Sequence, residues 1–194
     1  DSPYLPRTPY NASKAASDLA VRVYFDTFKV PITISNCSNN YGPYQFPEKL
    51  IPLFVTNLLD GKKVPLYKQS QNKREWLHTQ DHCTAIDLIL KKGKIGETYN
   101  IGSGIERSVE EITEIILKEL GKSENMKEYV DDRPGHDRRY LLDSSKISKE
   151  LGWKPDIEFE QGMSDTVKWY KDNRAWWGPL KEKVLDETAW QKKN

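Results

Sequence analysis

Residues 8–43, TPYNASKAASDLAVRVYFDTFKVPITISNCSNNYGP, decide the fold because they place a long helix directly before a short buried strand. The helix is predicted from about Pro9 to Phe28, and Val30-Pro31 ends it. The β-branched run Ile32–Ser35 predicts the strand, and Asn39–Pro43 after it predicts a loop. A helix followed by a buried strand is typical of an α/β fold.

Short helices and strands alternate along the rest of the chain. The predicted helices are 48–59, 81–90, 108–120, 144–151 and 159–173, and the predicted strands are 64–67, 75–78, 97–101, 127–130 and 140–142. Ser108-Val109-Glu110-Glu111 is a capping box that fixes one helix start. Beyond Arg174 we expect a charged tail anchored by Trp176, Trp177 and Trp190. Since no GxGxxG motif is present, the pattern predicts a mixed α/β fold rather than a complete dinucleotide-binding sheet.

The composition argues against several classes of protein. The 194 residues carry 30 basic and 29 acidic side chains, so no net positive field draws the chain onto nucleic acid or an anionic membrane. Cys37 and Cys83 are too few for a disulfide framework, which favours a reducing compartment. The longest apolar stretch, residues 50–59, is too short to span a membrane. We therefore expect a cytoplasmic protein with neither nucleic acid nor membrane as a partner.

Tyr10 and Lys14 are the first candidates for chemistry. Their spacing of four residues places them on one face of the predicted helix. A nearby ammonium favours the phenolate form of a tyrosine, so Lys14 could make Tyr10 a usable base. The spacing alone is weak evidence, because two solvated surface residues are the ordinary interpretation.

Several segments together resemble the extended short-chain dehydrogenases that act on nucleotide sugars. They are Tyr10–Ala16, Ser38–Pro43, Phe46–Pro52, Arg74–His78 with Asp81-His82, and Tyr99–Gly102. A further segment, Asp132–Tyr140, is similar to the signature of the dTDP-glucose 4,6-dehydratases in that superfamily. The resemblance covers nearly the whole chain.

The resemblance implies a fold and a domain organisation. We expect the C-terminal part of an NAD(P)-binding Rossmann fold together with the smaller mixed α/β substrate-binding domain, the N-terminal Rossmann half being absent. Residues 1–45 would be the remnant of the NAD-binding domain, residues 46–175 mainly the sugar-nucleotide-binding domain with segments returning to the Rossmann sheet, and residues 176–194 a tail. Without that sheet, the first helix is expected to expose Leu19 and Val23.

The activity implied is the NAD-dependent conversion of dTDP-glucose to dTDP-4-keto-6-deoxyglucose and water. Tyr10 would take the proton of the C4 hydroxyl, Lys14 would bind the nicotinamide ribose, and Asn40 would contact the cofactor, NAD. Elimination needs an Asp-Glu pair that the family carries before the tyrosine and this sequence lacks. We therefore expect the chain to be inactive alone and the full-length protein to be a homodimer.

The resemblance also implies a site for a dTDP-sugar. Arg74 and Arg133 would present guanidinium forks to the diphosphate, although surface salt bridges are their ordinary alternative. The other substrate-binding residues implied are Asn39, Lys49, Leu50, Pro65, Tyr67, Asn100 and His136. Tyr67 would lie against the base, but Lys68-Gln69-Ser70 replaces the Gly-Asp-Gly-like turn usual in the family. No metal is implied, and His82 is interpreted as structural.

Two alternatives stay open. The first is another epimerase, dehydratase or decarboxylase of nucleotide sugars from the same superfamily. The second is a non-catalytic module that binds a sugar nucleotide.

Overall fold

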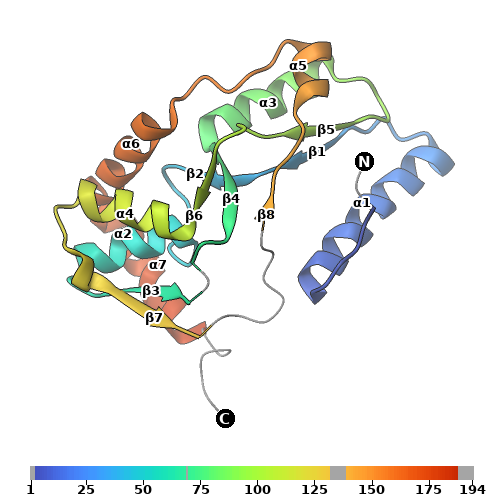
Figure 1. The fold of residues 1–194 in the computed structure, drawn as a ribbon. Helices are drawn as coiled ribbons and strands as arrows, with labels where there is room; N and C mark the ends of the chain where they lie inside the picture. Colours follow the sequence, from blue (N-terminus) through green and yellow to red (C-terminus); the bar gives the residue numbers. More distant parts are fainter. Residues whose placement is uncertain (1–2, 69, 132–138, 188–194) are drawn as a thin grey trace.

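A computed structural model describes residues 3–68, 70–131 and 139–187 of the chain, and Figure 1 shows their arrangement. The helices are α1 (Pro9–Phe28), α2 (Leu50–Leu59), α3 (Thr79–Lys92), α4 (Val109–Glu119), the 3-10 turn η1 (Glu124–Met126), α5 (Ser145–Leu151), α6 (Phe159–Asp172) and α7 (Arg174–Glu187). The strands are β1 (Ile34–Cys37), β2 (Asn39–Tyr41), β3 (Val64–Tyr67), β4 (Lys73–His78), β5 (Thr98–Ile101), β6 (Glu106–Ser108), β7 (Lys127–Val130) and β8 (Arg139–Tyr140). Within these ranges, no helix is both long and apolar enough to cross a membrane.

The first helix has the predicted bounds. The Thr8 hydroxyl accepts a hydrogen bond from the Asn11 amide at 3.2 Å, and Pro9 opens the first turn, where its missing N–H is not needed. No residue of α1 is buried, and Leu19 and Val23 are 53% and 56% exposed. The expected exposure of this helix is therefore confirmed, and Figure 1 shows α1 standing apart beside β1 and β5.

Strand pairing corrects two predictions at the start of the chain. The strand predicted at Ile32–Ser35 is β1, two residues further on, because Ile34–Cys37 pairs in parallel with Thr98–Ile101 of β5. The loop predicted at Asn39–Pro43 contains strand β2, which pairs in parallel with β4. Asparagine favours turns locally, and here pairing with a distant strand overrides that preference.

Strand β4 separates two hydrophobic cores. It pairs with β2 and β8 in parallel and with β6 antiparallel. Neighbouring strand residues point to opposite faces, so Trp76 enters one core and Leu77 the other. The first core contains α2, α4, α6 and β3, and the second contains α3, α5 and β5. Figure 1 shows these two groups of helices on either side of β4.

From Arg174 to Glu187 the chain is a helix, where a charged tail anchored by tryptophans was predicted. In α7, Trp177 is 1% exposed and donates a hydrogen bond from Nε1 to the Tyr170 carbonyl at 2.7 Å. Arg174 and Lys181 donate to the Asp60 carboxylate at 2.6 and 2.8 Å. Sequence reasoning missed this helix because its burial depends on one tryptophan and one ion-pair network. Trp190 lies outside the described residues.

Candidate substrate-binding site

A cavity of about 300 Å³ lies between β2, β4 and the start of α2. Its lining consists of Asn39, Asn40, Gln45, Lys49, Leu50, Ile51, Arg74, Trp76 and Val109. Five of these residues were predicted to bind substrate or cofactor: Asn39, Asn40, Lys49, Leu50 and Arg74. The fold thus brings together residues from three segments that are distant in the sequence.

The secondary structure explains how the two asparagines and the helix start reach the cavity. In the parallel pairing of β2 with β4, Asn39 lies opposite Trp76 and Asn40 opposite Leu77. Lys49 is the N-cap residue of α2, and its ammonium lies 2.7 Å from the Glu48 carboxylate. Both side chains of this pair are exposed, so the pair does not tie Lys49 down strongly and its ammonium can turn towards an anion.

Arg74 is the guanidinium of the cavity, and an aromatic ring supports it. Its Cζ lies 5.2 Å from the centre of the Tyr140 ring, within cation–π range. One terminal nitrogen donates to the Lys73 carbonyl at 2.8 Å. A guanidinium has five N–H donors in a planar fork, so a supported Arg74 suits the bidentate binding of phosphate oxygens.

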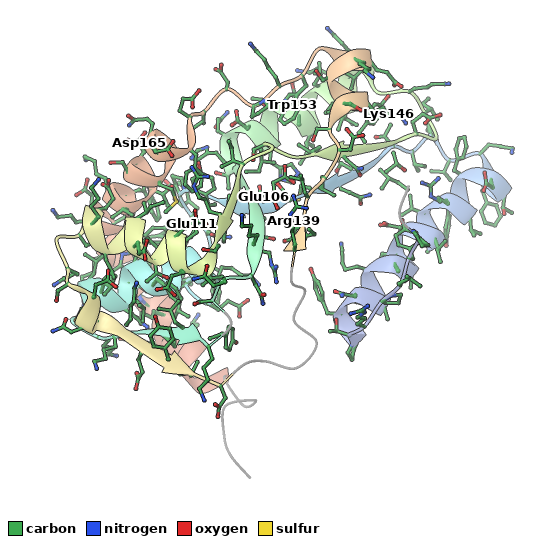
Figure 2. The ribbon with its side chains drawn as sticks, in the orientation of Figure 1. Glu106, Glu111, Arg139, Lys146, Trp153 and Asp165 are labelled. Atoms are coloured by element: carbon green, nitrogen blue, oxygen red, sulfur yellow. The ribbon has the colours of Figure 1, made fainter. Side chains whose placement is uncertain are left out.

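The strand that carries Tyr140 is fastened to the same sheet. Arg139 makes two hydrogen bonds of 2.7 Å to the Glu106 carboxylate, and Figure 2 shows the two side chains facing each other between β8 and β6. The carboxylate of Glu75, which is fully buried, accepts hydrogen bonds from the Gly104 and Leu142 amides at 2.7 and 3.0 Å. These contacts fix β8 beside Arg74. The predicted residues Arg133 and His136 lie outside the described residues.

The side chain of Asn40 is held by three neighbours. Its amide nitrogen donates to the Ser38 carbonyl at 3.0 Å and to the Cys37 sulfur at 3.4 Å, and its amide oxygen lies 2.9 Å from Nδ1 of His82. Burial lowers the pKa of His82, so the ring is neutral at pH 7 and donates from this nitrogen to the amide oxygen. His82 therefore orients Asn40, a more specific role than the structural one predicted.

Tyr10 and Lys14 do not line the cavity. Both are exposed on α1, Tyr10 by 68%. Cys37 is exposed by its surface area, yet desolvation of its sulfur raises the pKa of the thiol, against the hydrogen bond from Asn40 and the positive charge of Lys14. Asn40 contacts the same thiol directly, with its amide nitrogen 3.4 Å from the sulfur.

Three further predicted residues lie away from the cavity. Pro65 and Tyr67 belong to β3, which pairs in parallel with β7, and Asn100 belongs to β5, opposite Asn36. The unusual turn after Tyr67 contains the buried Ser70, whose hydroxyl donates to the Glu110 carboxylate at 2.6 Å. The binding roles of these three residues stay predictions.

Sequence reasoning missed Gln45 and the apolar walls of the cavity. Gln45 lies between two family segments, Ser38–Pro43 and Phe46–Pro52, and was assigned to neither. Ile51, Trp76 and Val109 carry no chemical signal because apolar residues of this kind occur throughout a core. A glutamine next to a turn gives no sequence signal either.

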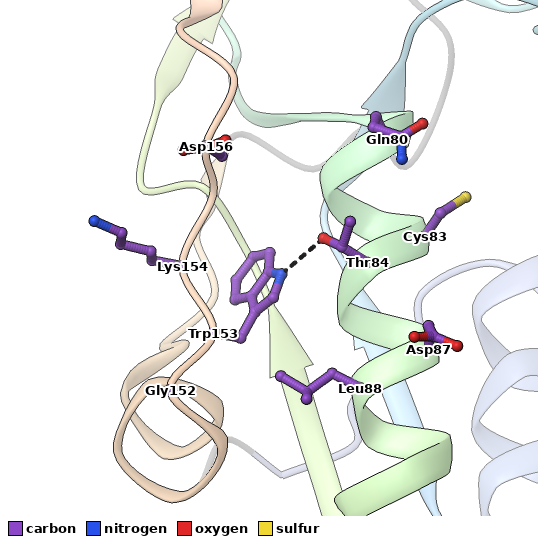
Figure 3. A pocket seen from close by; sticks show the side chains of 9 residues that line it. All are labelled: Gln80, Cys83, Thr84, Asp87, Leu88, Gly152, Trp153, Lys154 and Asp156. Carbon is purple, nitrogen blue, oxygen red and sulfur yellow. Dashed lines mark hydrogen bonds between the residues drawn. The ribbon is translucent and has the colours of Figure 1, made fainter.

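A second, larger groove of about 620 Å³ lies between α3 and the segment after α5 (Figure 3). None of its lining residues was predicted to bind a ligand. Trp153 packs between the two segments, and its Nε1 donates to the Thr84 hydroxyl at 3.2 Å. Trp153 is 6% exposed, as expected of a core residue.

The sequence of the chain matches known families and proteins. The profile of the family described as GDP-mannose 4,6 dehydratase matches residues 1–166. The dTDP-glucose 4,6-dehydratase of Streptomyces niveus is 52% identical over 93% of the chain and 54% of that relative. The dTDP-glucose 4,6-dehydratase of Streptomyces antibioticus is 50% identical over 96% of the chain and 56% of that relative. The chain therefore spans about half the length of the curated relatives it matches.

Solved structures agree with the predicted fold class. The dTDP-glucose 4,6-dehydratase of Streptomyces venezuelae, solved with NAD and dTDP bound, gives a TM-score of 0.91 at 53% sequence identity. The match covers 93% of the present chain and 56% of the Streptomyces chain. The enzyme of the same name from Bacillus anthracis, solved with NAD, gives a TM-score of 0.88 at 50% sequence identity, and the match covers 93% of the present chain and 57% of the Bacillus chain. UDP-glucose 4-epimerase of Thermotoga maritima, at 24% identity and a TM-score of 0.81, shares the fold alone. The predicted α/β class of Rossmann-type dehydrogenases and the predicted family resemblance are confirmed.

Proposed function

The chain belongs to the GDP-mannose 4,6 dehydratase family, and from this premise we propose that the whole protein is an NAD-dependent dTDP-glucose 4,6-dehydratase. The reaction is the conversion of dTDP-glucose to dTDP-4-keto-6-deoxyglucose and water. The observation that carries the proposal is the cavity, where Arg74, Lys49 and the asparagines of β2 meet. Two relatives of that name at 50–52% identity support the choice of substrate.

The cavity suits a nucleoside diphosphate sugar. Arg74 and Lys49 supply positive charge to the diphosphate, and Ile51, Trp76 and Val109 supply an apolar wall for the flat or ring-shaped parts of the ligand. Asn39 provides amide groups for hydroxyl groups. Arg133, His136, Pro65, Tyr67 and Asn100 complete the proposed binding residues.

The chemical step is assigned to Tyr10 and Lys14. Bound NAD would accept a hydride from C4 of the sugar and return it to C6 after water has left. Asn40 lines the cavity, and with Lys14 and Tyr10 of α1 it would hold this group. Lys14 holds the ribose hydroxyls of the cofactor, Tyr10 takes the C4 hydroxyl proton, and Asn40 contacts the nicotinamide.

We extend the proposal to the organisation of the protein. Residues 1–45 belong to the cofactor-binding domain and residues 46–175 mainly to the substrate-binding domain. The full-length protein is a homodimer in this proposal, as the family resemblance implies. We assign the protein to the cytoplasm. Analytical ultracentrifugation tests the dimer, and a monomer at micromolar concentration would contradict it.

An assay of the Tyr10→Phe variant tests the catalytic proposal. The full-length protein, dTDP-glucose and NAD are incubated, and mass spectrometry detects a sugar nucleotide that has lost one water. The variant removes the proton acceptor, so we expect turnover to fall by about 10²–10⁴-fold while dTDP binding is unchanged. Tyr4→Phe is the matched control, because it also removes a tyrosine hydroxyl near α1, one that donates to Asp18 of that helix at 2.9 Å. Unchanged turnover in Tyr10→Phe would refute the role of Tyr10.

One observation favours a second candidate, a non-catalytic module that binds a sugar nucleotide. The cavity is complete without any residue of α1, so binding does not require the Tyr10–Lys14 pair. Calorimetry separates the candidates, because the module binds dTDP and ignores NAD, whereas the enzyme binds both.

A further inference from the structure

The turn that leads from β2 to α2 contains a residue with an unusual backbone. Tyr44 has a φ of 63°, in the left-handed region that disfavours residues with a Cβ atom. Among the described residues, Lys29 is the other non-glycine residue with positive φ, and it caps the end of α1, where this conformation is common. Tyr44 has no such role, so another feature must hold it.

Two tryptophans and a tyrosine hold this turn. The ring of Tyr44 lies 4.5 Å from that of Trp169 and 5.4 Å from that of Trp176, and the two tryptophan rings lie 5.2 Å apart. The hydroxyl of the fully buried Tyr170 donates to the Gln45 carbonyl at 2.5 Å. Unfavourable backbone that is fixed so firmly from outside occurs most often at functional sites.

The residue that this turn places in the cavity is Gln45. Its amide nitrogen donates to the Asn40 carbonyl at 3.0 Å, so its donor end is engaged with the protein. No hydrogen bond to its amide oxygen is found among the described residues, and the side chain lines the cavity beside Arg74 and Lys49. The cavity therefore offers a neutral acceptor next to two cationic donors.

An amide oxygen in this place selects the chemical group it can meet. It repels phosphate oxygens, which Arg74 and Lys49 attract, so it must face a donor such as a hydroxyl group. Gln45 donates to the backbone carbonyl of Asn40, the residue assigned to the nicotinamide, so it lies beside that residue in the cavity. The hexose, with several hydroxyl groups, is the part of the ligand that fits.

We propose that Gln45 is a substrate-binding residue that accepts a hydrogen bond from a hexose hydroxyl, and that Tyr44, Trp169 and Trp176 position it. This proposal rests on the proposed function and deepens it. It adds a contact that distinguishes the sugar nucleotide from the nucleotide alone.

Calorimetry with dTDP and with dTDP-glucose tests the proposal. Gln45→Leu keeps the size of the side chain and removes the acceptor together with the bond to the Asn40 carbonyl. We expect the affinity for dTDP-glucose to fall about 10-fold and that for dTDP to stay unchanged. An equal change in both affinities, or no change in either, would overturn the contact with the hexose. Wild-type protein that binds neither ligand would overturn the proposed function itself, which keeps the two failures distinct.

The positioning role has its own test in Tyr44. Tyr44→Phe keeps the ring and should preserve the ratio of the affinity for dTDP-glucose to that for dTDP. Tyr44→Asn tolerates the left-handed backbone but lacks the ring, so the chain should fold while the ratio shifts by a few-fold towards that of Gln45→Leu. A ratio unchanged in Tyr44→Asn would show that the aromatic contacts do not position Gln45. Urea midpoints near that of the wild type confirm that each variant is folded.

Discussion

Helices α1 and α2 both carry predicted site residues, but they differ in how much of each helix is buried. Helix α2 has ten residues, of which six are buried and four of these belong to the larger core, and it starts at the cavity with Lys49 and Leu50. Helix α1 has twenty residues and none is buried, although it carries Tyr10 and Lys14. The binding residues are thus fixed by the core, whereas the pair assigned to catalysis stands on an exposed helix.

This difference separates binding from chemistry within the chain. Arg74, Asn39 and Lys49 depend on strand pairing and core packing that the described residues complete among themselves. The placement of Tyr10 depends on α1, whose contacts with the remainder are few, such as the hydrogen bond of 2.7 Å from Arg22 to Thr98. We expect nucleotide binding to be the more robust of the two properties.

Substitution of one leucine in each helix tests the comparison most strongly. Leu58 in α2 is fully buried, so Leu58→Ala should lower the free energy of unfolding by about 2–5 kcal/mol. Leu19 in α1 is 53% exposed, and Leu19→Ala should change the free energy of unfolding by less than about 0.5 kcal/mol. Urea denaturation measures both. An equal loss in the two variants would show that α1 is covered in solution.

A smaller effect is expected at the end of α2, where Asp60 connects it to α7. Burial opposes the charge of Asp60, but the hydrogen bonds from Lys181 and Arg174 prevail and hold the pKa of the carboxyl below its ordinary value. Asp60→Asn leaves the buried Lys181 ammonium without its charged partner, so we expect a loss of about 1–3 kcal/mol in unfolding free energy at pH 7.

The pH dependence of this loss follows from the direction of the shift. A carboxyl whose pKa is lowered by folding stabilises the fold above its unfolded pKa, and that contribution disappears as the pH falls. The gap between wild type and Asp60→Asn should therefore close between about pH 5 and pH 2. Asp172→Asn, at an exposed pair with Lys168, is the control and should show no measurable change. A gap that persists at low pH would contradict the account.

Some of this molecule could be predicted from the sequence because its signals are local. The capping box at Ser108 forms as predicted, with the Ser108 amide donating to Glu111 at 2.6 Å. Arg74 and the β2 asparagines, which the family resemblance implied, line the cavity, and their binding roles stay predictions. Gln45 was not predicted, because the Tyr170 hydroxyl that fixes it lies 125 residues away in the sequence. The strand β2 and the helix α7 were missed for the same reason, since distant contacts determine them.

The central claim, that the cavity between β2, β4 and α2 binds the diphosphate of a sugar nucleotide, is tested most directly by calorimetry of dTDP with two arginine variants. Arg74 and Arg107 lie opposite each other in the pairing of β4 with β6, but Arg107 is directed to Glu160, at 3.2 Å, and does not line the cavity. We predict that Arg74→Gln weakens dTDP binding by about 10–100-fold and that Arg107→Gln leaves it unchanged. Wild-type affinity in Arg74→Gln, or an equal loss in both variants, would contradict the claim.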